Sequence, residues 1–229
     1  MKLLYKVTIL IAFLFCGCKL AQDLTPAPTD SINIQNTMTS DVKVERLIRP
    51  YKEAMSEAMN EVIGFCPAFI EKKKPSSAIG SMMADAVMTA AVKIDKRTDF
   101  CLLNYGGIRS TLDSGEITVG EVYQIMPFEN QIIILKMEAT YLDTLATFTA
   151  NKGGEPFSKE VMQLDRTKIS QDGYFYLATN DYMANGGDNY SFLTKASERI
   201  TTNIKIRDAI MEYVKEQATF PLDYSIRKL

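Results

Sequence analysis

Three short segments of the sequence combine side chains that can bind a ligand with glycine or proline residues that shape a turn. The first is Asn104-Tyr105-Gly106-Gly107-Ile108-Arg109, which follows a short apolar run. A glycine pair lets the backbone turn tightly and lets a ligand approach it closely. Asn104 offers hydrogen-bond donors and acceptors, and Arg109 offers a planar fork for phosphate or carboxylate. Taken alone, this segment is more typical of a turn after a strand, with a solvated arginine.

The second and third segments add two aromatic rings and a carboxylate. Phe128 lies in Met126-Pro127-Phe128-Glu129-Asn130, and Tyr182 and Asp188 lie in the polar stretch 180–188. An aromatic ring at such a position is either a core residue or a platform on which a planar ligand stacks. A carboxylate between glycines can accept hydrogen bonds from sugar hydroxyls. Each signal is weak by itself.

Regular elements must position these segments. Helical periodicity and apolar runs predict an α+β fold, a mixed α/β arrangement in which helices pack on the outside of a mixed sheet. Ser76 or Ser77 is expected to cap the second helix. The predicted helices are 45–60, 78–94, 121–126, 141–149 and 205–217, and the predicted strands are 61–66, 99–103, 131–137 and 174–179.

Composition excludes several classes of function. The 229 residues include 26 Lys and Arg, 28 Asp and Glu and no His, with a net charge of −2. This balance gives no general electrostatic reason to bind nucleic acid, and none is expected as a partner. The absence of histidine excludes a histidine base, a histidine metal ligand and a Ser-His-Asp triad from this chain.

Taken together and in this order, the three segments are similar to the C-terminal domain of the 5′-nucleotidase family, which includes UDP-sugar hydrolases. The shared motifs are N-x-G-G-I-R from Asn104, P-F-x-N from Pro127 and Y-x-A-N-G-G-D from Tyr182. The match spans about residues 42–217. It also includes Ser77-Ala78-Ile79-Gly80, Ala84-Asp85-Ala86, Gly115-Glu116-Ile117-Thr118 and Glu121-Val122-Tyr123.

This resemblance implies a role for each candidate residue. Phe128 and Tyr182 match the two rings that hold the base, and Asp188 matches the acceptor for the ribose hydroxyls. Asn104 and Arg109 match the residues that contact the base or the phosphate side. The resemblance therefore predicts a nucleotide or nucleoside ligand.

The sequence departs from the family pattern at three places. Tyr182 stands where the family often has Phe, which preserves a stacking face, and Tyr105 stands where Gly is common and is expected to crowd the loop. The family also has an arginine before the helix at 78–94. Here that region offers only Lys72, Lys73 and Lys74, which lack the planar fork.

The catalytic half of the family is missing from the sequence. In the family, a separate N-terminal domain holds two divalent metals through Asp, His and Asn and activates a water molecule. Its D-x-H and G-N-H-[DE] motifs do not occur in this sequence. We therefore expect no catalytic residue, metal site or cofactor in this chain, and divalent metals only in a partner phosphatase domain.

Two functions remain open at this point. In the first, the chain is the substrate-recognition part of a split enzyme of nucleotide catabolism, completed by a metallophosphatase on another chain. In the second, it is a non-catalytic lipoprotein that binds nucleosides or nucleotides for scavenging. A protein that kept the fold and lost the site is disfavoured, because both rings, the Asp, the Asn and the Arg occur together.

The N-terminus predicts export and lipid anchoring. Residues 1–17 have the positive start and the short apolar run of a signal peptide, and the run is too short for a membrane span. Cys18, preceded by Gly17, resembles the lipidated cysteine of bacterial lipoproteins; cleavage before Cys16 and an ordinary cleaved signal are the alternatives. The mature protein is then membrane-anchored through its lipid, in the periplasm or on the cell surface.

The predicted domain organisation follows from that assignment. Residues 1–17 are the lipoprotein signal peptide, 18–40 a lipid-anchored flexible tether, and 41–229 a domain like the 5′-nucleotidase C-terminal domain. Cys66 and Cys101 lie in apolar runs, which favours buried thiols over a disulfide even in an exported chain.

Overall fold

The computed structural model describes residues 41–229. The predicted signal peptide, the tether and Cys18 lie outside the described residues. By its contacts the chain divides into residues 1–46 and 47–229. Helix α2 (Val42–Met59) includes this division, and none of its residues is buried. No helix within residues 41–229 is both long enough and apolar enough to cross a membrane.

Residues 47–229 contain a four-stranded mixed sheet in the order β2-β5-β4-β6. Strand β2 pairs parallel to β5, whereas β4 pairs antiparallel to both β5 and β6. The predicted mixed sheet is therefore confirmed. The four strands are β2 (Phe100–Cys101), β4 (Gln131–Glu138), β5 (Tyr174–Asn180) and β6 (Glu198–Lys205).

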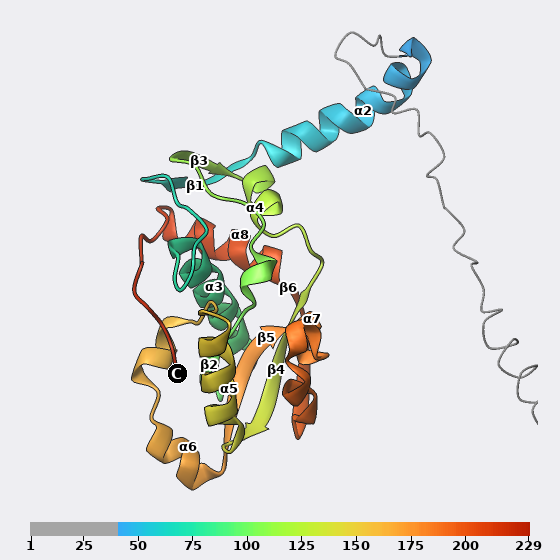
Figure 1. The fold of residues 1–229 in the computed structure, drawn as a ribbon. Helices are drawn as coiled ribbons and strands as arrows, with labels where there is room; N and C mark the ends of the chain where they lie inside the picture. The colour runs from blue at the N-terminus through green and yellow to red at the C-terminus, as the bar shows by residue number, and fades with distance from the viewer. Residues whose placement is uncertain (1–40) are drawn as a thin grey trace, which may run out of the picture. The chain divides into compact units, whose positions relative to one another are not determined.

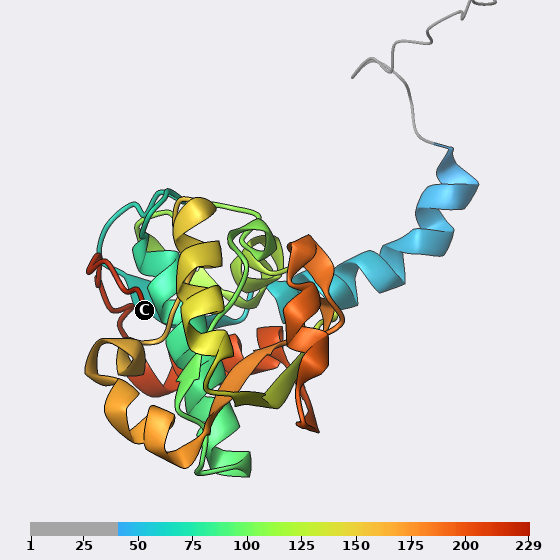
Figure 2. The same cartoon turned by 60° about the horizontal axis from the view of Figure 1, so that its bottom comes forward.

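Helices cover both faces of this sheet, as predicted (Figures 1 and 2). Successive side chains of a strand point to opposite faces, so β4 contributes to two cores. Ile132 and Ile134 pack in the core that includes α3 and α8, and Ile133 and Leu135 pack in the core that includes α5. The helices are α3 (Ala78–Ile94), α4 (Val119–Ile125), α5 (Tyr141–Asn151), α6 (Arg166–Asp172), α7 (Asp181–Ala184) and α8 (Ile206–Gln217).

Helix starts follow the local sequence. The Ser77 side chain accepts a hydrogen bond from the amide of Gly80 at 3.2 Å, so Ser77, not Ser76, caps α3. Thr118 and Glu121 form a reciprocal capping box at the start of α4. A second, two-stranded sheet pairs β1 (Val62–Cys66) antiparallel with β3 (Gly115–Thr118), the strand that leads into α4.

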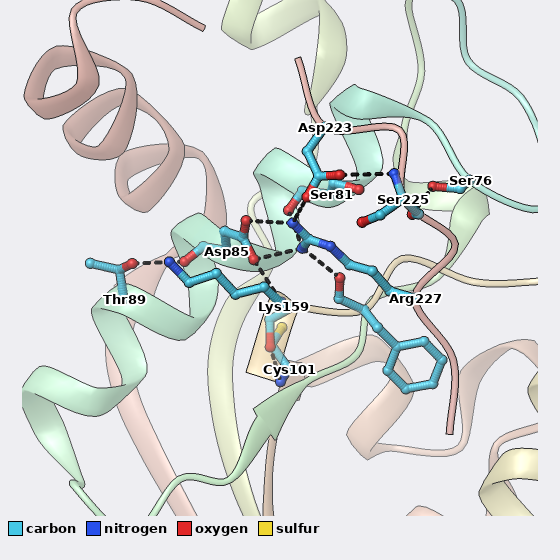
Figure 3. A network of polar contacts seen from close by, with 11 residues as sticks. Ser76, Ser81, Asp85, Thr89, Cys101, Lys159, Asp223, Ser225 and Arg227 are labelled. Carbon is cyan, nitrogen blue, oxygen red and sulfur yellow. Dashed lines mark hydrogen bonds and ion pairs between the residues drawn. The ribbon is translucent and has the colours of Figure 1, made fainter. Parts of the chain in front are cut away.

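The C-terminal residues 218–229 form a strap that returns over the fold, drawn in dark red in Figure 1. Arg227 lies at its end with only 3% of its side chain exposed, and its guanidinium pairs with the Asp85 carboxylate of α3 at 2.7 and 2.9 Å (Figure 3). The same guanidinium reaches Asp223 at 2.6 Å and the carbonyl oxygen of Phe157 at 3.0 Å. The strap is thus held by a buried ion pair between residues 142 positions apart.

Some elements differ from the sequence-based expectation. β6, β3, α6 and α7 were not predicted as regular elements, and β2 is shorter than expected. β6 is an edge strand with a mostly polar sequence, so it lacks the apolar run by which a buried strand is detected. Cys66 and Cys101 are buried free thiols, in agreement with the prediction.

Candidate functional site

All five residues singled out from the sequence as ligand-binding residues line one cleft of about 390 Å³. The sheet topology explains why they meet. The carboxyl ends of the parallel strands β2 and β5 lie at the same edge as the start of β4, which runs the opposite way. The loops after β2, before β4 and after β5 therefore converge. The lining residues are Asn104, Gly106, Gly107, Arg109, Phe128, Asn130, Tyr182 and Asp188.

The floor of the cleft is a chain of amide and carboxylate hydrogen bonds. Asn180 donates its side-chain NH₂ to Oδ1 of Asn104 at 2.9 Å, and Asn104 donates to Oδ2 of Asp188 at 2.8 Å. Asn104 and Asn180 are 8% and 3% exposed. Oδ1 of Asn180 also accepts a hydrogen bond from the backbone amide of Met183 at 2.7 Å, and this bond caps α7. Because both amides are buried and bonded, Asp188 is held at a defined place.

The two glycines of the first loop leave room for this chain of bonds. A Cβ on Gly107 would lie 3.3 Å from Oδ1 of Asn104, and one on Gly106 would lie 3.4 Å from its Nδ2 and 3.8 Å from Oδ2 of Asp188. The amide of Gly107 donates to the Asn104 carbonyl oxygen at 3.0 Å, which closes the turn. Glycine thus keeps this stretch of loop close to the polar floor.

Tyr105 does not line the cleft, so the expected crowding of the loop is wrong. Its ring faces the basic loop instead, with the Nζ atoms of Lys72 and Lys74 at 4.2 and 5.0 Å from the ring centroid. Its backbone amide donates to the buried carboxylate of Glu155. Burial raises the pKa of Glu155 above its usual value.

Lys72 connects the basic loop to the first site loop. Its Nζ donates to the carbonyl oxygen of Ile108 at 2.6 Å. Burial, together with repulsion from Arg109 and Lys74, lowers the pKa of Lys72. Positive charge therefore gathers beside Arg109, although the arginine that the family pattern places before α3 is absent.

The Phe128 loop is held from α8 by a residue that the sequence did not single out. Arg207 has only 4% of its side chain exposed, and one of its Nη atoms lies 3.5 Å from the carbonyl oxygens of both Met126 and Phe128. Its guanidinium also pairs with Glu129, which pairs with Lys205 on its other side. Hydrogen bonds from Lys205 and Arg207 lower the pKa of Glu129 to about 2.

The two rings of the site are accessible. Phe128 is 40% exposed and Tyr182 is 47% exposed. The Arg109 guanidinium carbon lies 5.6 Å from the centroid of the Phe128 ring, within the range of a cation–π contact. The cleft thus presents an aromatic face beside a cation, and it also presents the Tyr182 ring, whose hydroxyl is bonded to the Asp188 carboxylate.

Size alone does not mark this cleft, because hollows of about 460, 520 and 680 Å³ occur elsewhere in residues 41–229. The cleft differs in that rings, a carboxylate, an arginine and two asparagines converge in it. Across residues 41–229, no group of three or more His, Cys, Asp or Glu side chains is arranged to hold a metal ion.

Asn180, Asn130, Glu155 and Arg207 were not chosen as site residues from the sequence. Asn130 lines the cleft and donates to Asp181 at 2.6 Å. Asn130 and Asn180 could have been identified from the sequence, because they belong to the second and third segments. Arg207 and Glu155 had no local signal, since their roles depend on contacts with residues about 50 to 80 positions away.

Comparison with known proteins shows which proteins this chain resembles. Residues 58–145 match the family model described as "5′-nucleotidase, C-terminal domain". Endonuclease YhcR of Bacillus subtilis is 27% identical over 218 residues, covering 86% of this chain and 18% of the relative. A 5′-nucleotidase of Vibrio parahaemolyticus is 23% identical over 210 residues, covering 83% and 36%.

Solved structures show the same fold. A 5′-nucleotidase precursor of Thermus thermophilus has a TM-score of 0.62 at 20% identity, covering 82% of this chain and 43% of that one. The NAD nucleotidase NadN of Haemophilus influenzae has a TM-score of 0.59 at 18% identity, covering 86% and 42%. The chain spans less than half the length of each of these relatives.

Proposed function

We propose that the chain carries a C-terminal domain like that of the 5′-nucleotidase family, whose model matches residues 58–145, and that its cleft binds a nucleoside or nucleotide. The observation that carries this proposal is the convergence of Phe128, Tyr182, Asp188 and Arg109 on one cleft. Each corresponds to one part of such a ligand: the rings to the base, the carboxylate to the sugar and the arginine to phosphate.

The physical chemistry supports this assignment. A planar base stacks on an aromatic side chain with about 1–3 kcal/mol per base, whatever its hydrogen-bonding edge. Phe128 and Tyr182 are exposed enough to stack with a ligand. A carboxylate is an acceptor for the hydroxyls of ribose, and Asp188 is fixed by Asn104 in a position facing the cleft.

The phosphate side is supplied by local positive charge despite the acidic net charge of the chain. Arg109 lines the cleft, and Lys72 and Lys74 gather around Tyr105 beside it. An arginine fork binds phosphate oxygens with two parallel hydrogen bonds. The site therefore suits a nucleotide as well as a nucleoside.

We further propose that the chain is the recognition part of a split enzyme of nucleotide catabolism, exported and anchored through Cys18. The support is that the given sequence has no histidine and neither of the D-x-H and G-N-H-[DE] motifs that the resemblance associates with the two-metal domain. The divalent metals and the activated water would belong to a metallophosphatase on another chain. A neighbouring gene for such a domain, lacking this C-terminal part, distinguishes this role from nucleoside scavenging.

The binding proposal is tested by calorimetry with adenosine, AMP and UDP-glucose on the purified full chain. Phe128→Ala is expected to weaken binding roughly 5- to 150-fold, the equivalent of about 1–3 kcal/mol of lost stacking. Phe69→Ala is the matched control, because Phe69 is 57% exposed and does not line the cleft. Equal affinity in wild type and Phe128→Ala would contradict the site assignment.

The split-enzyme proposal is tested by phosphate release from AMP in the presence of Mn²⁺. We expect the pure chain to show no metal-dependent turnover, and activity to appear only when a metallophosphatase partner is added. Robust turnover by the pure chain would overturn the split-enzyme proposal without affecting the binding proposal.

A further inference from the structure

The hydroxyl of Tyr182 has a partner of its own inside the cleft. It donates a hydrogen bond to Oδ1 of Asp188 at 3.0 Å and accepts a hydrogen bond from the backbone amide of the same residue at 3.1 Å. The other carboxylate oxygen, Oδ2, accepts from Asn104 at 2.8 Å. Both oxygens of the carboxylate that faces the ligand are therefore already engaged by protein donors.

The loop is shaped around this contact. A Cβ on Gly187 would lie 2.5–2.6 Å from three carbons of the Tyr182 ring, so only glycine allows the ring to lie where it does. Asp188 itself has φ 52° and ψ 28°, in the left-handed region that non-glycine residues rarely adopt. The strained backbone and the glycine together bring the amide and the carboxylate of Asp188 to one hydroxyl.

We propose that the Tyr182 hydroxyl sets the sugar specificity of the cleft, in addition to the stacking role of its ring. This inference rests on the proposed function, in which Asp188 accepts the sugar hydroxyls. A carboxylate has about four acceptor positions, two on each oxygen. Tyr182 takes one position on Oδ1 and Asn104 takes one on Oδ2.

The consequence is that a second sugar hydroxyl adds less binding free energy. A ribose diol that places one hydroxyl on each oxygen must share Oδ1 with Tyr182 or displace it. A 2′-deoxyribose can place its single hydroxyl on Oδ2, which it shares with Asn104 just as the diol does, so it has no contact at Oδ1 to lose to Tyr182. The wild-type cleft therefore discriminates weakly between ribonucleosides and 2′-deoxyribonucleosides, and the phenol hydroxyl is the group that weakens this discrimination.

The test compares the dissociation constants of adenosine and 2′-deoxyadenosine, measured by calorimetry with the purified full chain. Tyr182→Phe removes the hydroxyl and keeps the ring. We expect the ratio of the 2′-deoxyadenosine constant to the adenosine constant to rise on the order of tenfold, mainly through tighter adenosine binding. Tyr224→Phe makes the same change at a tyrosine that is also 47% exposed and lies outside the cleft, and it should leave the ratio unchanged.

The possible outcomes separate the two proposals. If the wild type binds adenosine and the ratio in Tyr182→Phe is unchanged or falls, the specificity role is overturned while the binding function stands. A fall would show that the hydroxyl instead holds Asp188 ready for the diol. If the wild type binds neither nucleoside, the binding function fails and the specificity role fails with it.

Discussion

Replacing Arg227 with methionine tests whether the C-terminal strap depends on a buried ion pair. The Arg227 and Asp85 side chains are only 3% and 9% exposed. Loss of the guanidinium would leave the Asp85 carboxylate with the amide of Lys159, at 2.9 Å, as its remaining hydrogen-bond donor. Removing one partner of a buried pair strands a desolvated charge, which costs about 3–5 kcal/mol.

This loss is large relative to the whole stability of a domain, about 5–15 kcal/mol. Urea unfolding followed by circular dichroism should therefore show a markedly lower midpoint for Arg227→Met. Arg166→Met is the matched control. Arg166 pairs with Asp143 on the surface, where the side chains are 46% and 87% exposed, and such pairs contribute about 0–1 kcal/mol.

A double variant tests whether the loss of stability comes from the stranded Asp85 carboxylate. Asp85→Leu combined with Arg227→Met removes both charges, so no carboxylate is stranded in the core. We expect the double variant to be more stable than Arg227→Met alone, because replacement of a whole buried pair by apolar groups is often close to neutral. A loss below about 1 kcal/mol in Arg227→Met, or a double variant at least as unstable, would refute this reasoning.

Two further predictions concern a helix cap and the loop of the proposed stacking ring. Ser77→Ala should lower the free energy of unfolding by about 1 kcal/mol, because the side chain accepts a bond from the third residue of α3. Thr140→Ala, at a cap position that makes no such bond, should change it little in the same urea titration. The pKa of Glu129, about 2 in the folded chain, lies below its usual 4.5, so its contribution is present above pH 4.5 and lost as pH falls toward 2. The stability difference between wild type and Glu129→Gln should thus exist at pH 6 and vanish near pH 2; a difference that persists at pH 2 would contradict the ion pairs.

Much of the fold could be predicted because its signals are local. Helix α3 begins and ends at the predicted residues, since an apolar helical pattern follows a serine cap. Strand β4 agrees with the prediction to one residue, because a run of buried apolar residues marks it. β6 lacks such a run. The helices α6 and α7 are too short to show a clear helical periodicity in the sequence.

The candidate site shows the same division between local and distant information. Turn glycines, two aromatic residues and an aspartate next to predicted strands were enough to select residues that line one cleft, while their roles stay predictions. The sequence did not indicate that Tyr105 turns away, that Arg207 holds the Phe128 loop, or that Tyr182 binds Asp188.

The sequence by itself determined the longer helices and the apolar strands, the residue types of the candidate site and the lack of any histidine chemistry, because these depend on local patterns and on composition. Only the tertiary structure decided which of these residues are neighbours. The chain from Asn180 through Asn104 to Asp188 joins residues 76 and 84 positions apart, and the Arg227–Asp85 pair joins residues 142 apart. Such contacts depend on the strand order and on burial, since a polar group hidden from water must find its partner wherever the fold places one.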